Sequence, residues 1–108
     1  MLSGVPNMFL AVGYTNASWT LKVDLTHRHA VRLINHLEKI GCSRILPKRK
    51  GEVHNIPLLN LSSGYIKRAE SQLPKQASRK PWRLNQNYIL DTMALKFSSV
   101  VNDELDFS

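Results

Sequence analysis

The chain has 108 residues and carries 15 lysine and arginine residues against 8 acidic residues, which gives a formal net charge of +7. This length allows one domain at most, and the positive balance attracts anions in general without choosing among nucleic acid, nucleotide phosphates and acidic membranes. Cys42 is the single cysteine, which excludes a disulfide framework and a cysteine-based zinc site, and the four histidines lack partners at metal-ligand spacing. We therefore expect no metal site and a reducing, cytoplasmic setting.

The first predicted element is a strand over residues 7–13 (NMFLAVG), a short apolar run between Pro6 and Gly13. A continuous apolar run is typical of a strand buried on both faces of a parallel sheet. One strand has no pairing partner by itself, so the chain must supply other strands or borrow them. The apolar start lacks a basic segment, which argues against a secretory signal, and it is too short to span a bilayer.

The second predicted element is a helix over residues 17–40. Its apolar positions recur at helical spacing: Ala30, Leu33, Ile34 and Leu37. Gly41 is well placed to end this helix in a left-handed conformation. Asn16 or Ser18 would cap a long helix and Thr26 a shorter one, and we favour the early start.

The remainder of the chain has weaker patterns. Residues 43–60 contain three helix-breaking prolines or glycines and predict a loop. Residues 63–72 predict a short helix that ends before the next proline, and residues 74–83 predict an extended or irregular segment. Residues 85–97 again suit a helix, and the acidic end, residues 102–108, either adds a short strand or stays frayed.

The junction between the predicted strand and the long helix, residues 13–18 (GYTNAS), is a candidate binding site. The first turn of a helix presents unpaired backbone N–H groups and the positive end of the helix dipole, which favour anionic or electron-rich groups. The same geometry also occurs as an ordinary tight turn that leads into a capped helix.

Two long stretches resemble class B flavoprotein monooxygenases, in the Baeyer–Villiger-like branch that includes the ethionamide-activating bacterial enzymes. The first stretch is GVPNMFLAVGYTNASWTLKVDLTHRHAVRLINHLEKIG, and the second is SSGYIKRAESQLPKQASRKPWRLNQNY. The resemblance implies an α/β fragment: residues 1–41 are the terminal strand and helix of an FAD-binding dinucleotide domain, and residues 42–108 are a mainly helical, loop-rich C-terminal extension.

The same resemblance implies an FAD- and NADPH-dependent enzyme that oxygenates ketones or sulfur and nitrogen compounds. It puts Gly13, Thr15, Asn16 and Ser18 beside the flavin, where backbone donors do most of the work. Trp19 and Leu21 either line that pocket or pack in the core, and we favour packing. The sequence identifies no catalytic residue.

The chain departs from the family because it contains neither G-x-G-x-x-G turn for the FAD and NADPH phosphates. We therefore expect no stable cofactor binding by this chain alone, and a partner in the missing N-terminal part of the flavoprotein. Such a fragment should be less compact than an independent domain. Whether the chain is itself an enzyme stays open.

Two alternatives remain. The first is nucleic-acid binding through the basic runs 48–50 and 79–80 with Trp82 stacking on a base, which we disfavour because the runs lie in predicted loops. The second is a small module that docks Leu33, Ile34 and Leu37 on the sheet of a partner.

Overall fold

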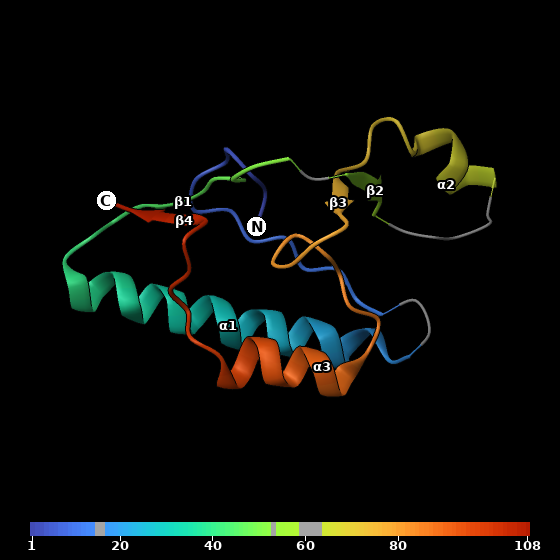
Figure 1. Ribbon diagram of the computed structural model, residues 1–108. Coiled ribbons are helices and arrows are strands. Elements are labelled where there is room, and N and C mark those ends of the chain that lie inside the picture. Colours follow the sequence, from blue (N-terminus) through green and yellow to red (C-terminus); the bar gives the residue numbers. More distant parts are fainter. Residues whose placement is uncertain (15–16, 53, 59–63) are drawn as a thin grey trace.

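The computed structural model describes residues 1–14, 17–52, 54–58 and 64–108. Figure 1 shows α1 (Trp19–Ile40) and α3 (Tyr88–Thr92) side by side, with the short strands and loops on one side of this helical layer. α2 (Gly64–Ala69) lies at the opposite end of the molecule from the C-terminus. The chain is thus a small α/β unit, as expected.

The long helix α1 confirms the prediction for residues 17–40, with a start at Trp19. It buries Lys22, Leu25, Leu33 and Leu37, which share one face because their spacing follows the helical period. Gly41 ends the helix at φ 70°. Its N–H donates to the Glu38 carbonyl at 3.2 Å, and the Cys42 N–H donates to the Leu37 carbonyl at 3.0 Å. This is the double hydrogen bond of a Schellman motif.

The predicted strand at residues 7–13 does not form. Asn7 adopts a positive φ of 56°, which turns the chain away from extended geometry. Its N–H donates to the Ile45 carbonyl at 3.0 Å, but no backbone hydrogen bond joins residues 8–13 to another described residue in a ladder. The prediction was wrong because an apolar run becomes a strand only where a neighbouring strand pairs with it.

Two short antiparallel sheets occur instead. β1 (Ile45–Pro47) pairs with β4 (Leu105–Phe107), so that Ile45 lies opposite Phe107. The strand β4 is one of the two outcomes left open for residues 102–108. The expected loop at residues 43–60 was wrong where β1 and the first strand of the second sheet form. That sheet pairs β2 (Asn55–Pro57) with β3 (Lys75–Ala77). Both pairs join segments far apart in sequence, which local pattern does not reveal.

The core is small and lies between α1 and the first sheet. Leu33, Leu37 and Ile45 are its buried members, with relative exposures of 8% or less. Six partly buried side chains pack around them: Met1, Phe9, Cys42, Val100, Leu105 and Phe107. The His36 and Phe107 rings meet edge to face at 5.2 Å. This contact attaches β4 to the helix and so fixes the first sheet over α1.

The C-terminal helical segment confirms the prediction for residues 85–97. It consists of α3 and a π-helical turn, η1 (Met93–Phe97). The Asn87 side chain caps its start by accepting hydrogen bonds from the backbone N–H groups of Ile89 at 2.9 Å and Leu90 at 3.1 Å. Arg32 of α1 donates to the Leu95 carbonyl at 2.7 Å, which anchors η1 against the long helix.

The chain is more open than a compact domain of its length. Its Cα radius of gyration is 14.5 Å, whereas about 13 Å is typical for a domain of roughly this length. Its accessible surface is 7283 Å², against about 6,100 Å² for a folded monomer of this mass. These values agree with the expectation of reduced compactness. Across the described part of the chain, no helix combines the length and apolar character needed to cross a bilayer.

Candidate functional site

The predicted site begins at Gly13, which is buried against the indole ring of Trp19. A side chain added at Gly13 would overlap that ring, so this glycine is needed for close packing. Trp19 itself is 51% exposed and Leu21 is 40% exposed. The expectation that these two residues pack in the core was therefore wrong: they lie on sides of α1 that the small core does not reach.

Ser18 lies at the N-cap position of α1 with φ −58° and ψ 122°. Its hydroxyl makes no capping hydrogen bond and instead lies 2.9 Å from the hydroxyl of Thr20. No acidic side chain occupies the first turn. The first backbone N–H groups of α1 are therefore not capped by the Ser18 side chain, and they retain the positive end of the helix dipole. Thr15 and Asn16, the other two predicted site residues, lie outside the described residues.

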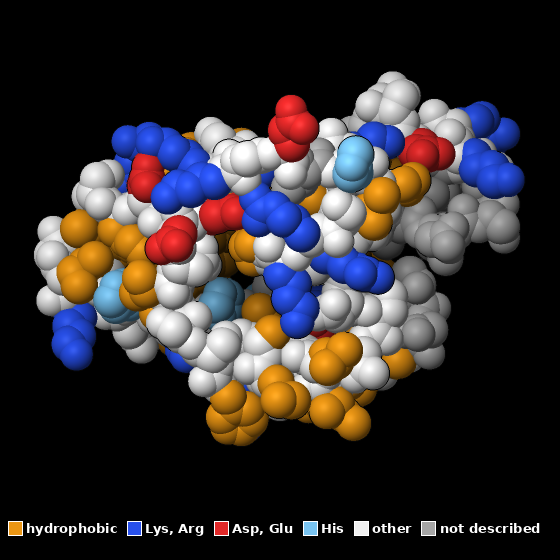
Figure 2. All heavy atoms as spheres, in the orientation of Figure 1, with side chains coloured by type: hydrophobic (Ala, Val, Ile, Leu, Met, Phe, Trp, Pro, Cys, Tyr) orange, Lys and Arg blue, Asp and Glu red, His pale blue; other side chains and the backbone are white. Residues whose placement is uncertain are grey.

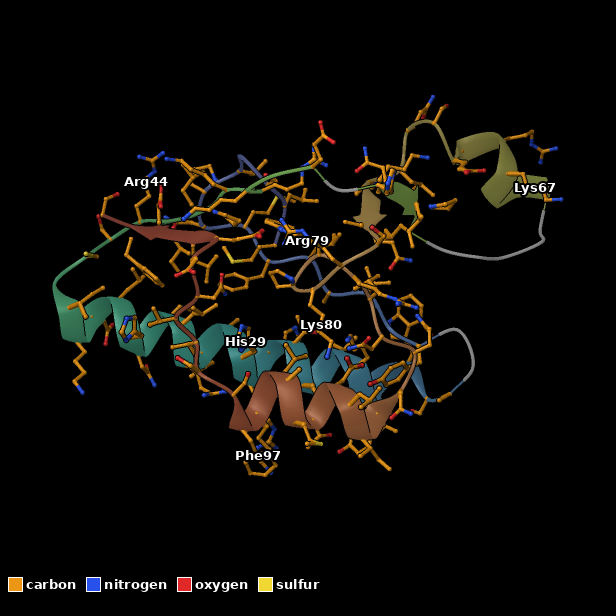
Figure 3. All side chains as sticks on the ribbon, in the orientation of Figure 1. His29, Arg44, Lys67, Arg79, Lys80 and Phe97 are labelled. Carbon is orange, nitrogen blue, oxygen red and sulfur yellow. The ribbon has the colours of Figure 1, made fainter. Side chains whose placement is uncertain are left out.

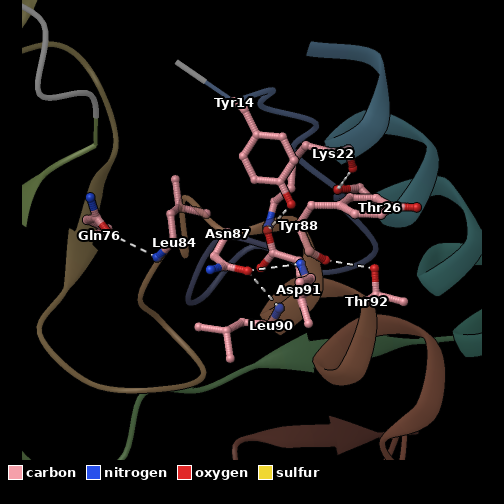
Figure 4. A network of polar contacts seen from close by, with 11 residues as sticks. Tyr14, Lys22, Thr26, Gln76, Leu84, Asn87, Tyr88, Leu90, Asp91 and Thr92 are labelled. Carbon is pink, nitrogen blue, oxygen red and sulfur yellow. Dashed lines mark hydrogen bonds and ion pairs between the residues drawn. The ribbon is translucent and has the colours of Figure 1, made fainter. Parts of the chain in front are cut away.

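The site contains a buried polar cluster that the sequence did not predict. Tyr14 is 3% exposed, and its hydroxyl donates to the carboxylate of Asp91. Lys22 Nζ lies 2.8 Å from the same carboxylate oxygen. Figure 4 shows the three side chains pointing toward one another from the N-terminal segment, α1 and α3. The cluster therefore ties the segment after Gly13 to both helices.

The electrostatics of this cluster keep Tyr14 protonated. Burial raises the pKa of the Tyr14 hydroxyl above its ordinary value, and its hydrogen bond to Asp91 raises the pKa further. Lys22 and Asp91 retain only 10% and 3% of their side-chain exposure, so each is the charge partner of the other in a nearly dry setting. A phenol with a raised pKa is poorly suited to give up its proton. The cluster holds Tyr14 against Lys22 of α1 and Asp91 of α3.

One signal in the sequence points to this cluster. Asp91 is the single charged residue in the run YILDTMAL, whose other residues are apolar apart from Thr92, and Lys22 lies four positions after the predicted turn at residues 13–18. An acid in such a run is buried only with a partner, because an isolated buried charge is strongly unfavourable. The identity of the partner depends on the fold, since Tyr14 and Asp91 are 77 positions apart.

A cavity of about 480 Å³ adjoins the cluster, between α1, the N-terminal segment, residues 80–85 and the C-terminal helical segment. Its walls are mainly apolar, with Phe9, Leu33 and Leu95 among them, and Lys22 and Asp91 also line it. His29 also borders it; its Nδ1 atom has no hydrogen-bond partner among the described residues. Burial lowers the pKa of His29, which favours the neutral imidazole.

The basic surface considered for nucleic acid is largely used in internal contacts. Arg79 Nη1 lies 2.6 Å from one carboxylate oxygen of Glu104, and the indole N–H of Trp82 donates to the other. Burial opposes ionisation of Glu104, but these two donors outweigh burial and lower its pKa. Lys48 pairs with Asp106 at 2.5 Å. Figure 3 shows the labelled Arg79 and Lys80 within the loops above α1.

The part of the chain that the structure describes contains no group of three or more His, Cys, Asp or Glu side chains that could bind a metal ion. Cys42 is a free thiol. The candidate site is therefore the start of α1 beside Gly13, where the Ser18 side chain makes no capping hydrogen bond, next to the Tyr14–Lys22–Asp91 cluster.

Comparison with known proteins confirms the resemblance to flavoprotein monooxygenases over the whole chain. The chain is 44% identical over 109 residues to the FAD-containing monooxygenase EthA of Mycolicibacterium smegmatis, a match that covers 100% of the chain and 22% of that protein. It is 42% identical over 98 residues to the probable FAD-binding monooxygenase AlmA of Acinetobacter baylyi, covering 89% of the chain and 20% of that protein.

A third relative, the putative FAD-containing monooxygenase MymA of Mycobacterium tuberculosis, is 33% identical over 110 residues, which cover 100% of the chain and 22% of that protein. The chain thus spans about a fifth of the length of the curated relatives it matches. No family model and no solved structure matches the chain.

Proposed function

We propose that this homologue of the carboxy-terminal part of FAD-containing monooxygenases supplies the flavin-facing end of such an enzyme. The observation that carries the proposal is the pairing of whole-chain similarity with a helix start where the Ser18 side chain makes no capping hydrogen bond, beside the buried Gly13. In this proposal residues 1–41 belong to the FAD-binding domain, and residues 42–108 form an extension that supports it.

The residues present fit the flavin end of FAD. The backbone N–H groups at the start of α1 are suited to the negative charge that a flavin gains on reduction, and no acidic side chain opposes it in the first turn. Gly13, Thr15, Asn16 and Ser18 are the proposed contacts. Bound FAD would supply the oxygenation chemistry, while the residues of this chain bind and orient the ring.

The residues present do not fit the pyrophosphate or adenine of FAD, because the chain has no glycine-rich turn that leads into a helix after a strand. We therefore propose that the remaining FAD contacts, and those to NADPH, come from the part of the relatives that this chain does not cover. Oxygenation of ketones or of sulfur and nitrogen compounds is then a property of the complete enzyme, and the chain alone is inactive. A reducing, cytoplasmic setting belongs to the same proposal.

A flavin titration tests this function. FAD fluorescence and absorbance are followed with the purified chain alone, and again after mixing with the M. smegmatis relative from which the matching stretch has been deleted. We expect FAD retention only in the mixture. Tight FAD binding by the chain alone, with a well-folded circular dichroism spectrum, would contradict the proposed division of the site.

A substitution at the helix start tests the proposed contact itself. Ser18→Asp places a negative charge where the flavin is proposed to lie, while it favours the start of α1 through the helix dipole. The mixture with Ser18→Asp should retain FAD about tenfold more weakly, whereas Ser71→Asp, in the exposed turn after α2, should leave retention unchanged. Equal retention by both variants would remove Ser18 from the flavin site.

A further inference from the structure

The C-terminal helical segment, residues 88–97, turns its apolar side outward. We define the outer strip as Ile89, Leu90, Met93 and Phe97, which are 70%, 48%, 61% and 72% exposed. The inner side of the same segment carries Asp91, which is 2% exposed. A helix at the surface of an isolated domain normally shows the opposite arrangement, with apolar residues inside and charged residues outside.

This orientation is fixed by polar contacts that hold the segment at both ends. Near its start, Asp91 accepts a hydrogen bond from Tyr14 and pairs with Lys22 at 2.8 Å. Near its end, Arg32 donates to the carbonyls of Leu95 at 2.7 Å and Ser98 at 2.6 Å. Rotation of the segment to bury the outer strip would break these contacts and expose a charge pair. The strip is therefore held outward in the folded chain.

The charge distribution indicates what kind of partner covers this strip. Figure 2 shows hydrophobic side chains gathered along the lower edge of the molecule, while many of the lysine and arginine side chains lie along the upper part of this face. In Figure 3 the labelled Phe97 lies at the lower edge and Arg44 at the upper left. Within residues 88–97, Lys96 and the buried Asp91 are the charged side chains. Attraction to an anionic membrane would therefore act mainly on the upper part of this face. Lys96, whose Nζ lies 5.5 Å from the centre of the Phe97 ring, is the single basic side chain of residues 88–97.

A second copy of the chain is also a poor occupant, because each copy carries a net charge of +7 and two copies repel each other at low salt. The remainder of a relative is a better occupant of the strip, since four fifths of each relative lies outside the stretch that this chain matches. A contiguous exposed apolar strip of large side chains is the kind of surface that marks a protein contact.

We infer that the outer strip docks on an apolar surface of the FAD-carrying part of a flavoprotein monooxygenase, the part of the relatives that this chain does not match. This inference rests on the proposed function and adds the surface through which the two parts meet. Docking there would fix the position of α3 against the partner. Because Asp91 of α3 accepts a hydrogen bond from Tyr14, the same contact would also fix the position of Tyr14, which follows Gly13.

The test measures complex formation between the full 108-residue chain and the M. smegmatis relative from which the matching stretch has been deleted. The strip variant is Met93→Ser with Phe97→Ser. The matched control is Val31→Ser with Ile34→Ser, because these α1 residues are also exposed, at 54% and 46%. Ile34 also belongs to the docking face predicted from the sequence, whose other members, Leu33 and Leu37, are buried. Circular dichroism checks that each variant folds, and Phe97→Leu provides a milder change that keeps the strip apolar.

We expect the strip variant to bind about tenfold or more weakly and the control to bind like the unchanged chain. Phe97→Leu should bind more tightly than the strip variant, because it keeps the strip apolar. Equal binding by the strip variant, or equal loss in the control, would overturn the inference. It would likewise be overturned if the strip mediated only self-association or binding to phosphatidylglycerol vesicles. The FAD content of the complex separates the two proposals. If the complex forms equally well with the strip variant and retains FAD, only the docking surface is refuted. A strip-dependent complex without FAD refutes only the flavin site, and no complex at all refutes both.

Discussion

The hydroxyl of Tyr14 donates to the carboxylate of Asp91, which lies 77 positions later in the chain. This bond joins the segment after Gly13 to α3, and Lys22 of α1 completes the cluster from the third side. The N-terminal segment, through Tyr14, and α1, through Lys22, therefore both contact the buried Asp91 carboxylate of α3.

Asp91→Asn should strongly destabilise the chain, because it leaves the nearly buried Lys22 without a charge partner. Loss of one member of a buried pair typically costs about 3 kcal/mol. The matched control is Asp24→Asn, which removes an exposed helical pair with Arg28 and should cost less than about 1 kcal/mol. Denaturant unfolding measures both variants, and equal effects would show that the buried pair has no special role.

Tyr14 should make the chain sensitive to alkali. Its pKa is raised above the ordinary value in the folded chain, so the folded state favours the protonated phenol. This contribution is fully present below the unfolded pKa of about 10 and is lost as the pH rises toward the folded value. Tyr14→Phe should therefore lose stability less steeply above about pH 10 than the unchanged chain. Parallel curves for the two proteins would contradict this assignment.

His29 should make the chain sensitive to mild acid. Its pKa is lowered by burial, so its contribution is present above the unfolded pKa of about 6.5 and is lost as the pH falls toward the folded value. His29→Leu removes both this titration and the unpartnered Nδ1 atom. We expect this variant to be at least as stable near neutral pH and to show a flatter decline between about pH 7 and pH 5, as measured by denaturant midpoints.

Gly13→Ala should displace the Trp19 ring, because the added Cβ would overlap the indole. We expect a cost of about 1 kcal/mol or more from overpacking, together with a change in tryptophan fluorescence. The same substitution in a Trp19→Ala background should be nearly neutral, since the overlapping ring is then absent. An undiminished cost in that background would show that Gly13 is required for another reason.

The helical parts of the fold follow from local sequence. The helical spacing of Leu33 and Leu37, together with Gly41, predicts α1 and its end, and the apolar pattern of residues 85–97 predicts the C-terminal helical segment. Helices are predictable in this way because their hydrogen bonds and buried faces involve residues only three or four positions apart.

The candidate site is only partly accessible to sequence reasoning. The resemblance predicts Gly13, Thr15, Asn16 and Ser18 as flavin contacts, but it did not identify Tyr14, Lys22 and Asp91 as a buried cluster. The resemblance also did not indicate that the Trp19 ring lies against Gly13, because this contact does not follow from the periodic spacing of a helix or a strand.

By itself the sequence determined the kinship with FAD-containing monooxygenases, the long helix and the absence of a glycine-rich phosphate turn. Only the tertiary structure decided that residues 7–13 form no strand, that β1 pairs with β4, and that the outer strip faces away from the core. The physical reason is that strand pairing and buried ion pairs join residues remote in sequence. These contacts form only when the whole chain has folded. The buried Asp91 then determines which side of α3 faces outward.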